Sequence, residues 1–392
     1  MKAFTPLAVL SCIAGLQAGV LEDRLARIPQ RMQEFVDKGA VFGVVTLVQH
    51  QGKPVSLKAV GFQDAEKKQP MAADSIFQVM SMTKPVTSVG ILILAEEGRL
   101  SLTDTVEKDI PEFRGQMLVA EKQPDGRLIL KKPARPITLR DLLTHTSGMQ
   151  EFPPDGMGGL DFYRKMDKPL SEAVSVYSQL PLLFEPGSRV QYSNPGMATL
   201  GRIIEVVSGM PYEKFLDARI FQPLGMKDSF FFPPAEKRGR VCHVHVPGQS
   251  QFQEIARRPY REGARYSFPE GGLYSTAADM AAFYQMMRNG GAYNGKRILS
   301  PAAVKAMTEA HNEAVQPAGT VFGLGWAVVN GPRGTLTLHS EGSFGHGGAF
   351  GTYGWIDPAK DLVGVFMIQV LGGQAGAIQQ VFVSMANAAI TD

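Results

Sequence analysis

Hydrophobic runs of strand length lie near both ends of this chain, whereas the middle carries the wider apolar spacing of helices. Near the amino end, the runs Val41–Val48 and Val55–Val60 are rich in β-branched residues, which favour strands. The intervening Gln51-Gly52-Lys53-Pro54 is typical of a turn. The pattern predicts an antiparallel hairpin, preceded by a polar helix over residues 21–38.

Strand patterns return near the carboxyl end, at Thr335–His339, Gly351–Ile356 and Leu362–Ile368. A turn at Asp357-Pro358-Ala359-Lys360 joins the last two of these strands. The pattern of residues 374–389 predicts a closing helix. The chain is therefore expected to begin and end beside a sheet.

The middle of the chain predicts a helical insertion. Helical patterns separated by Pro- and Gly-rich loops occur at residues 138–143, 170–180, 196–207 and 212–220. Residues 115–136 predict an extra hairpin on the rim of this region. The succession of sheet, helices, sheet and terminal helix indicates an α+β fold. We expect a sheet unit from residues 19–95 and 266–392, and a mainly helical unit from residues 96–265.

The start of one predicted helix carries candidate chemistry. Ser75–Val79 has the composition of a strand, and the apolar run Pro85–Gly98 predicts a buried helix that ends at Gly98. Ser81 and Lys84, between them, are three residues apart and share one helix face. The unpaired amides of a helix N-terminus also favour negative charge on a reacting oxygen.

Ser81 and Lys84 together supply the groups that acyl transfer needs. A serine hydroxyl is a weak nucleophile at neutral pH, and a lysine whose pKa is lowered by burial can act as its base. The same spacing occurs by chance on solvated helices. The assignment therefore depends on further residues.

Tyr192-Ser193-Asn194 lies in a loop bracketed by Pro-Gly pairs and followed by a helical pattern. A structural interpretation makes Tyr192 a packed aromatic residue and Asn194 a helix cap. A catalytic interpretation places Tyr192 near Ser81, where positive charges or dipoles hold it as phenolate and let it shuttle a proton.

The glycine-rich segment Gly345–Gly351 precedes a predicted strand. Its glycines let the backbone pass very close to a bound ligand. An amide in this segment and the amide of Ser81 are candidates for the two halves of an oxyanion hole. The alternative is a glycine-rich turn with a solvated His346.

Other candidate sites lack support. Cys242, His243 and His245 have the two-residue period of a strand, and no further ligands cluster in sequence, so we expect no metal site and no cofactor. No serine lies in a Gly-x-Ser-x-Gly elbow. His145 lies in a segment that we interpret as a helix C-terminal loop rather than part of a Ser-His-Asp triad.

Composition narrows the classes of function. The chain has 392 residues, of which 44% are hydrophobic, so a sizeable core is available. The formal net charge is +3 with dispersed basic residues, which gives no electrostatic basis for nucleic-acid binding. No apolar run beyond the first eighteen residues is long enough for a membrane span. The composition indicates no particular oligomeric state.

The first eighteen residues have the pattern of a signal peptide. Lys2 precedes an apolar run, Ala3–Leu16, and the small residue Ala18. We therefore expect export to the periplasm or the extracellular space. The alternatives are an uncleaved amphipathic helix in a cytoplasmic protein and lipidation at Cys12. Cleavage leaves Cys242 without a partner for an intramolecular disulfide.

Three motifs, Ser81-x-x-Lys84, Tyr192-x-Asn194 and His346-x-Gly348, resemble in type and order those of the serine β-lactamase and penicillin-binding protein superfamily. The resemblance is to its class C and family VIII carboxylesterase branch, and it covers nearly everything after about residue 25. Further stretches that match the branch are Leu142–Gly148, Gln222–Met226, Gly271–Met280 and Phe322–Trp326.

The resemblance implies an antiparallel sheet flanked by helices from both chain ends, with an inserted helical domain and the active site between them. It implies that Ser81 attacks an acyl carbonyl while Lys84 and Tyr192 transfer protons. The backbone amides of Ser81 and Ala349 are the implied oxyanion hole. The implied substrate-binding residues are Asn194, His346, Gly347 and Gly348.

His346 departs from class C β-lactamases, which carry Lys-Thr-Gly in the third motif. A histidine is largely neutral at pH 7, whereas that lysine helps to hold the carboxylate of penicillins and peptide termini. We therefore predict a carboxylesterase for small, short-chain acyl esters, with weak or no β-lactam hydrolysis. The alternatives are a D-amino-acid-specific peptidase or amidase, a class C-like β-lactamase, and an inactive binding protein of the same fold.

Overall fold

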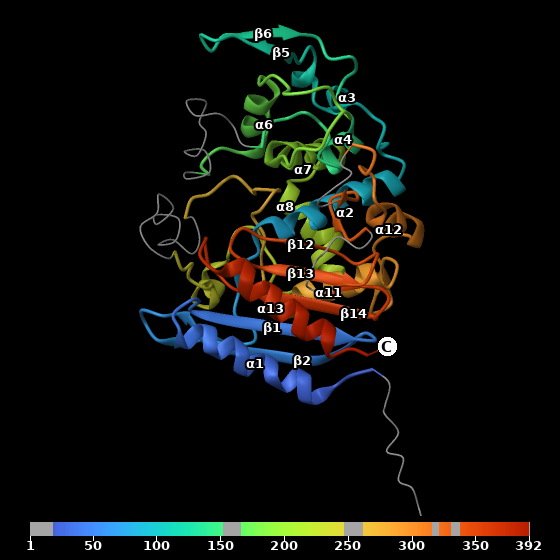
Figure 1. Ribbon diagram of the computed structural model, residues 1–392. Helices are drawn as coiled ribbons and strands as arrows, with labels where there is room; N and C mark the ends of the chain where they lie inside the picture. The colour runs from blue at the N-terminus through green and yellow to red at the C-terminus, as the bar shows by residue number, and fades with distance from the viewer. Residues whose placement is uncertain (1–18, 152–165, 247–261, 316–320, 331–337, 392) are drawn as a thin grey trace, which may run out of the picture.

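A computed structural model describes residues 19–151, 166–246, 262–315, 321–330 and 338–391 (Figure 1). The predicted leader over residues 1–18 lies outside the described residues, as does most of the predicted strand at residues 335–339. Within the described chain, no helix is both long and apolar enough to cross a membrane.

The main sheet is antiparallel throughout its described strands, in the order β10-β11-β12-β13-β14-β1-β2-β3. The central strands β1 and β14 pair from Val45 opposite Met367 to His50 opposite Leu362. The two ends of the chain therefore meet in the middle of the sheet. The strands are β1 (Gly43–His50), β2 (Lys53–Asp64), β3 (Gln69–Pro70), β10 (Val321–Phe322), β11 (Ala327–Val328), β12 (Phe344–Gly347), β13 (Tyr353–Asp357) and β14 (Leu362–Met367).

Helices cover both faces of this sheet, which is why every residue of β1 is buried. Val44 and Val48 belong to the core between the sheet and the terminal helices, whereas Val45 and Leu47 belong to the larger core on the opposite face. Successive side chains of a strand point to opposite faces, so one strand anchors both layers. The terminal helices are α1 (Glu22–Asp37) and α13 (Ala375–Ala388), and the opposite face carries α2 (Thr83–Glu96) and α11 (Ala277–Arg288).

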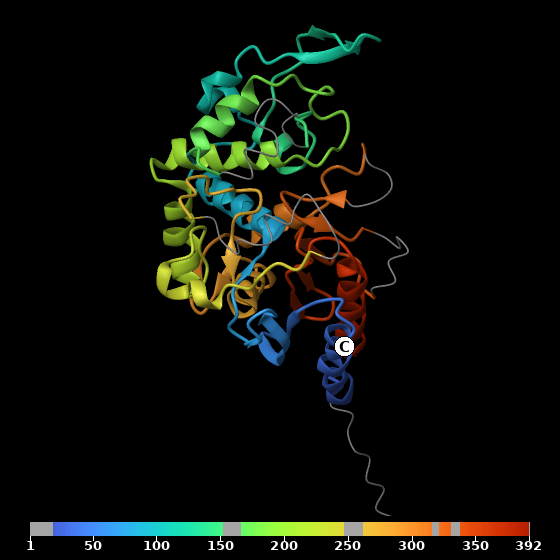
Figure 2. The ribbon, with the colours of Figure 1, turned by 90° about the vertical axis from the view of Figure 1, so that its left-hand side faces the viewer.

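The helical part of the chain lies beyond α2, away from the terminal helices (Figures 1 and 2). A two-stranded hairpin, β5 (Leu118–Lys122) with β6 (Leu128–Lys131), projects from its far end. The larger core cluster runs through both parts and joins them. The helices here are α3 (Val106–Asp109), α4 (Leu139–Leu143), α6 (Leu170–Ser178) and α7 (Asn194–Ser208). The chain then returns beside α2 and α11 through α8 (Tyr212–Leu216) and α9 (Gln222–Leu224).

Shorter elements complete the described chain. They are the strand pairs β4 (Phe77–Gln78) with β7 (Tyr274–Ser275) and β8 (Ala292–Tyr293) with β9 (Lys296–Arg297), the helix α12 (Pro301–Thr308), the 3₁₀ turns Met80–Met82, Pro111–Phe113 and Ala235–Arg240, and the π turn Asp217–Phe221.

The predicted α+β fold is confirmed, and so are the amino-terminal hairpin, the closing helix and the extra hairpin within residues 115–136. The unit boundaries at residues 95/96 and 265/266 stay a prediction. One local expectation is wrong: His346 lies within β12, not in a loop before a strand. Glycines on both sides of it hide the period of that strand, because they carry no side chain to mark a face.

Candidate active site

Ser81 lies where a short strand pair turns into a long buried helix. β4 pairs with β7, and the 3₁₀ turn Met80–Met82 then leads directly into α2. Met80 has a φ of +52°, a left-handed conformation that is unusual for a residue with a side chain. The Thr83 hydroxyl donates to the Met80 carbonyl at 2.6 Å and stabilises this turn. The predicted buried helix is confirmed; it begins at Thr83, and Ser81 lies in the 3₁₀ turn directly before it.

Lys84 points from the first turn of α2 towards Ser81. Its side chain is 0% exposed, and its Nζ atom shares a hydrogen bond of 2.9 Å with the Ser81 hydroxyl. Burial lowers the pKa of Lys84 to about 7, and the carboxylates of Glu270 and Glu151 only partly offset this effect. A substantial share of the amine is therefore uncharged at neutral pH and able to accept a proton.

The loop before β7 holds the other side of the Lys84 amine. Lys84 Nζ donates to the backbone carbonyl of Glu270 at 2.6 Å. One turn along α2, the Thr87 hydroxyl donates to the carbonyl of Pro269 at 2.7 Å. The Tyr266 hydroxyl donates to the Glu270 carboxylate at 2.7 Å. The loop is thereby fixed to the helix that carries the nucleophile.

Tyr192 joins this pair from the loop before α7. Lys84 Nζ lies 4.6 Å from the centre of the Tyr192 ring. Burial raises the pKa of Tyr192 above its usual range, and the nearby hydroxyl of Ser81 only partly offsets this. The expectation of a phenolate is therefore wrong, because the buried phenol keeps its proton at neutral pH.

The helix that follows Tyr192 has a different N-cap residue from the Asn194 that the structural interpretation expects. Ser193, not Asn194, is the N-cap of α7, and its hydroxyl accepts from the amide of Gly196 at 3.1 Å. Asn194 is the first residue of the helix and is buried. Pro195 occupies the first turn, where its missing N–H costs no helical hydrogen bond. Asn194 as a substrate-binding residue stays a prediction.

His346 is buried in β12, so the interpretation as a solvated histidine is wrong. Its Nδ1–H donates to the carbonyl of Gly347 at 2.7 Å, and its ring centre lies 6.2 Å from that of Tyr192. Burial and the nearby charge of Lys84 lower the pKa of His346 to about 3. The third motif therefore presents an uncharged ring near the nucleophile.

The turn after His346 packs against the segment that leads into Ser81. Thr352 Oγ1 donates to the carbonyl of Val79 at 2.8 Å, and the Gly348 amide donates to the carbonyl of Thr352 at 2.7 Å. A Cβ atom on Gly348 would lie 2.3 Å from the Val79 carbonyl oxygen, so only glycine fits there. The amides of Ser81 and Ala349 as an oxyanion hole stay a prediction that this packing favours.

Two residues of this site were missed in the sequence. The sequence indicates only a loop for His145, and His145 does follow α4, but its buried ring lies 4.6 Å from that of Tyr192. Glu270 directly precedes the Gly271-Gly272 pair, and it acts on Lys84 through a backbone carbonyl that has no signature in sequence. The conspicuous motif around His145 was the one available signal.

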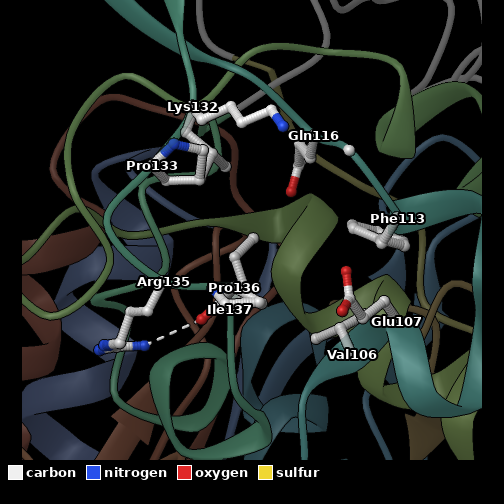
Figure 3. Close-up of a pocket in the computed structure, with 11 residues that line it drawn as sticks. Val106, Glu107, Phe113, Gln116, Lys132, Pro133, Arg135, Pro136 and Ile137 are labelled. Atoms are coloured by element: carbon white, nitrogen blue, oxygen red, sulfur yellow. Dashed lines mark hydrogen bonds between the residues drawn. The ribbon is translucent and has the colours of Figure 1, made fainter.

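A cavity of about 230 Å³ lies elsewhere, beneath the projecting hairpin (Figure 3). Phe113, Ile137 and Leu182 are among the apolar residues that line it, with the polar chains of Glu107, Gln116 and Lys132 beside them. None of the predicted site residues lines this cavity. The part of the chain that the structure describes holds no cluster of histidine, cysteine or acidic residues able to bind a metal ion.

Comparisons with known proteins agree with this architecture. The lovastatin esterase of Penicillium rubens is 31% identical over 369 residues, covering 86% of this chain and 91% of that protein. Esterase EstB of Burkholderia gladioli is 28% identical, and the match covers 86% of this chain and 88% of that protein. A putative D-alanyl-D-alanine carboxypeptidase of Salmonella typhimurium is 27% identical, and the match covers 92% of this chain and 85% of that protein.

Among solved structures, EstCE1, a hydrolase with promiscuous acyltransferase activity, superposes with a TM-score of 0.76. It is 24% identical and covers 93% of this chain and 99% of that one. This likeness shows the β-lactamase/transpeptidase-like fold. The family model described as Beta-lactamase matches residues 28–382, nearly the whole described chain. This chain therefore belongs to the β-lactamase family.

Proposed function

We propose that this protein is a serine carboxylesterase that cleaves short-chain acyl esters through an acyl-enzyme on Ser81. The observation that carries the proposal is the buried amine of Lys84, 2.9 Å from the Ser81 hydroxyl. A lysine with a pKa of about 7 is half deprotonated at neutral pH and matches the base that a serine nucleophile needs.

Acylation begins as Ser81 Oγ attacks the ester carbonyl carbon and its proton passes to Lys84 Nζ. The amides of Ser81 and Ala349 stabilise the oxyanion that forms. Tyr192 then gives its phenolic proton to the leaving alkoxide while it takes the proton from Lys84, and the C–O bond breaks. The alcohol leaves, and the acyl group stays on Ser81.

Deacylation runs the same proton path in reverse. A water molecule attacks the acyl carbonyl carbon, and its proton passes through Tyr192 to Lys84 as the second tetrahedral intermediate forms. Collapse of that intermediate returns the proton to Ser81 Oγ and releases the carboxylic acid. All proton transfers run between the substrate, water and the side chains of Ser81, Tyr192 and Lys84, so no cofactor is required.

The uncharged ring of His346 supports esters as the substrate class. A lysine in the third motif offers a permanent charge to a substrate carboxylate, and charged hydrogen bonds are stronger than neutral ones. His346 has a pKa of about 3 and cannot supply that charge at neutral pH. Neutral esters lose nothing by its absence. The esterases among the relatives favour the same choice.

A D-amino-acid-specific peptidase is the second candidate, since one relative is a putative D-alanyl-D-alanine carboxypeptidase. Peptide termini carry a carboxylate, so this activity needs a cationic group that His346 does not provide. A panel of D-alanyl peptides and amides separates the two candidates. A fluorophosphonate that labels Ser81 would argue against an inactive binding protein.

The test compares kcat/KM for p-nitrophenyl butyrate with kcat/KM for a chromogenic cephalosporin. We expect a clear preference for the ester, and a preference for the cephalosporin would overturn the proposal. Ser81→Ala is the control and should abolish hydrolysis of the ester without unfolding the protein. Hydrolysis that persists in this variant would rule out the acyl-enzyme.

We further propose that the leader is removed during export. The support is the apolar run Ala3–Leu16 followed by Ala18. Mass spectrometry of the mature amino terminus from the native host measures this directly. A full-length chain would instead support the uncleaved amphipathic helix, and a lipid on Cys12 would support lipidation.

A further inference from the structure

His145 touches the backbone on both sides of Tyr192. The amide of Gln191 donates to the His145 carbonyl at 2.8 Å, and the amide of Ser193 donates to His145 Nδ1 at 3.3 Å. His145, from the loop after α4, thus accepts hydrogen bonds from the amides of both chain neighbours of the tyrosine.

The rings of His145 and Tyr192 are also in contact. Their centres are 4.6 Å apart and the planes are tilted by 35°. Phe322 of β10 packs edge-on against His145 with its ring centre 4.9 Å away, and its ring centre is 6.4 Å from that of Tyr192. His145 is 1% exposed, and the ring of Tyr192 packs against its ring inside the protein.

The hydrogen bond from Ser193 defines the tautomer of His145. Nδ1 can accept that bond only when it carries no proton, which places the single proton of a neutral ring on Nε2. The titratable groups that face this ring are the phenol of Tyr192, which contacts it, and Lys84 and His346, whose charges act on it. Burial, Lys84 and His346 hold the pKa of His145 well below its usual range, so the ring keeps the acceptor.

A histidine at this position has an energetic cost that an apolar side chain of the same size would avoid. Nε2 has no hydrogen-bond partner among the described residues, and an unpaired buried polar group costs about 1–3 kcal/mol. A phenylalanine would fill the same space without this unpaired nitrogen, but it would leave the Ser193 amide without its acceptor.

We infer that His145 is a positioning residue for Tyr192, acting through its Nδ1 acceptor and its ring. It fixes the phenol between Ser81 and Lys84, so that the proton can move along one path. The inference rests on the proposed function, because it concerns the proton transfer assigned to Tyr192. A positioning residue of this kind affects turnover far more than substrate binding.

The test uses three substitutions of His145 and p-nitrophenyl butyrate as the substrate. His145→Phe keeps a ring and removes the acceptor. His145→Asn keeps an acceptor at the position of Nδ1, and asparagine tolerates the positive φ of His145, which is +56°. His145→Gly removes both groups without backbone strain, and it replaces His145→Phe if that variant does not fold.

We expect His145→Phe or His145→Gly to lower kcat at least tenfold, because small misplacement of a catalytic group costs about 10²-fold. KM should change by less than about threefold, and His145→Asn should restore part of the lost kcat. In a Tyr192→Phe background, the same substitutions of His145 should have almost no further effect, because the group that they position is gone.

Two results would overturn the inference. One is an unchanged kcat in a folded variant that lacks the acceptor. The other is a loss of the same size in the Tyr192→Phe background, since it would mean that His145 acts independently of Tyr192. An unmodified enzyme that hydrolyses no ester would contradict the proposed function instead, so the two failures are distinguishable.

Discussion

Lys84 donates a hydrogen bond of 2.6 Å to the backbone carbonyl of Glu270, which lies 186 positions later in the chain. This bond uses one N–H of the amine and leaves its lone pair available to the Ser81 hydroxyl at 2.9 Å. Because a neutral carbonyl does not compensate a full buried charge, the bond orients the amine without keeping it protonated.

The first prediction concerns the pH dependence of ester hydrolysis. The reacting form of Lys84 is the free amine, so kcat/KM should rise as the pH increases through about 7 and then level off. A stopped assay over pH 5 to 9 measures the midpoint. Lys84→Arg keeps a permanent positive charge, so its kcat/KM should be lower by a factor of about 10² or more. A midpoint above pH 9 would contradict a buried, uncharged lysine.

The second prediction concerns Tyr192→Phe, which removes one hydroxyl and keeps the ring that packs on His145. We expect kcat for p-nitrophenyl butyrate to fall about 10²- to 10⁴-fold, the usual contribution of a positioned acid or base. KM and the circular dichroism spectrum should stay near those of the unmodified enzyme. A fall of less than threefold would mean that the proton takes another path.

The third prediction tests the role of His346 in substrate choice. His346→Lys places a cation beside the nucleophile, so the ratio of cephalosporin to ester kcat/KM should rise roughly tenfold, as expected for one charged hydrogen bond. His346→Gln is the matched neutral control and should leave the ratio unchanged. The added charge should also move the midpoint of the pH profile downwards, because a like charge lowers the pKa of Lys84. An unchanged ratio would show that the charge of residue 346 does not determine the choice between ester and cephalosporin.

Local sequence predicts the segments whose structure depends on contacts between residues that are near each other in the chain. The hairpin of β1 and β2, the start of α2 and the spacing of Ser81 and Lys84 all depend on residues a few positions apart. The alternation at β12 was obscured by glycine, and β10 and β11 have two residues each, too few to establish a period.

The parts of the site that sequence did not reveal depend on long-range contacts. The burial of His346 follows from the sheet neighbours of β12 and from Tyr192, and no local pattern marks it. His145 is adjacent to Tyr192 only because α4 packs on α7. The raised pKa of Tyr192 is likewise a consequence of burial, which the loop composition around it did not indicate.

The fourth prediction concerns stability in mild acid. Burial lowers the pKa of His145, His339 and His346 below that of an exposed histidine. Below about pH 6.5 the unfolded chain binds protons that the folded protein does not, so the free energy of unfolding falls as the pH falls. Above about pH 7.5 these groups are neutral in both states and contribute nothing.

We expect a loss of about 1 kcal/mol for each of these histidines between pH 7.5 and pH 5.5. Urea unfolding at several pH values measures the slope. Buried carboxylates such as Asp141, whose pKa is lowered by Arg135, lose their contribution only near pH 4 and below. His346→Gln should have a shallower slope over the same range, and an equal slope would exclude His346 as a source.

The fifth prediction concerns Gly201 of α7, which makes room for the loop that holds Lys84. Its helical backbone would ordinarily favour alanine by about 1 kcal/mol. A Cβ atom here, however, would lie 2.3 Å from Cγ of Pro269, the residue just before Glu270. Gly201→Ala should therefore displace the loop and cost about 1–3 kcal/mol of unfolding free energy.

Gly376 of α13 provides the matched control, since a Cβ atom there meets nothing within 4 Å. Gly376→Ala should leave ester hydrolysis unchanged and keep or raise the free energy of unfolding. Gly201→Ala should in addition lower kcat, because a shifted Glu270 carbonyl no longer orients the amine of Lys84. Urea unfolding and ester kinetics on both variants measure this. A destabilised Gly201→Ala enzyme with unchanged kcat would show that the loop does not position Lys84.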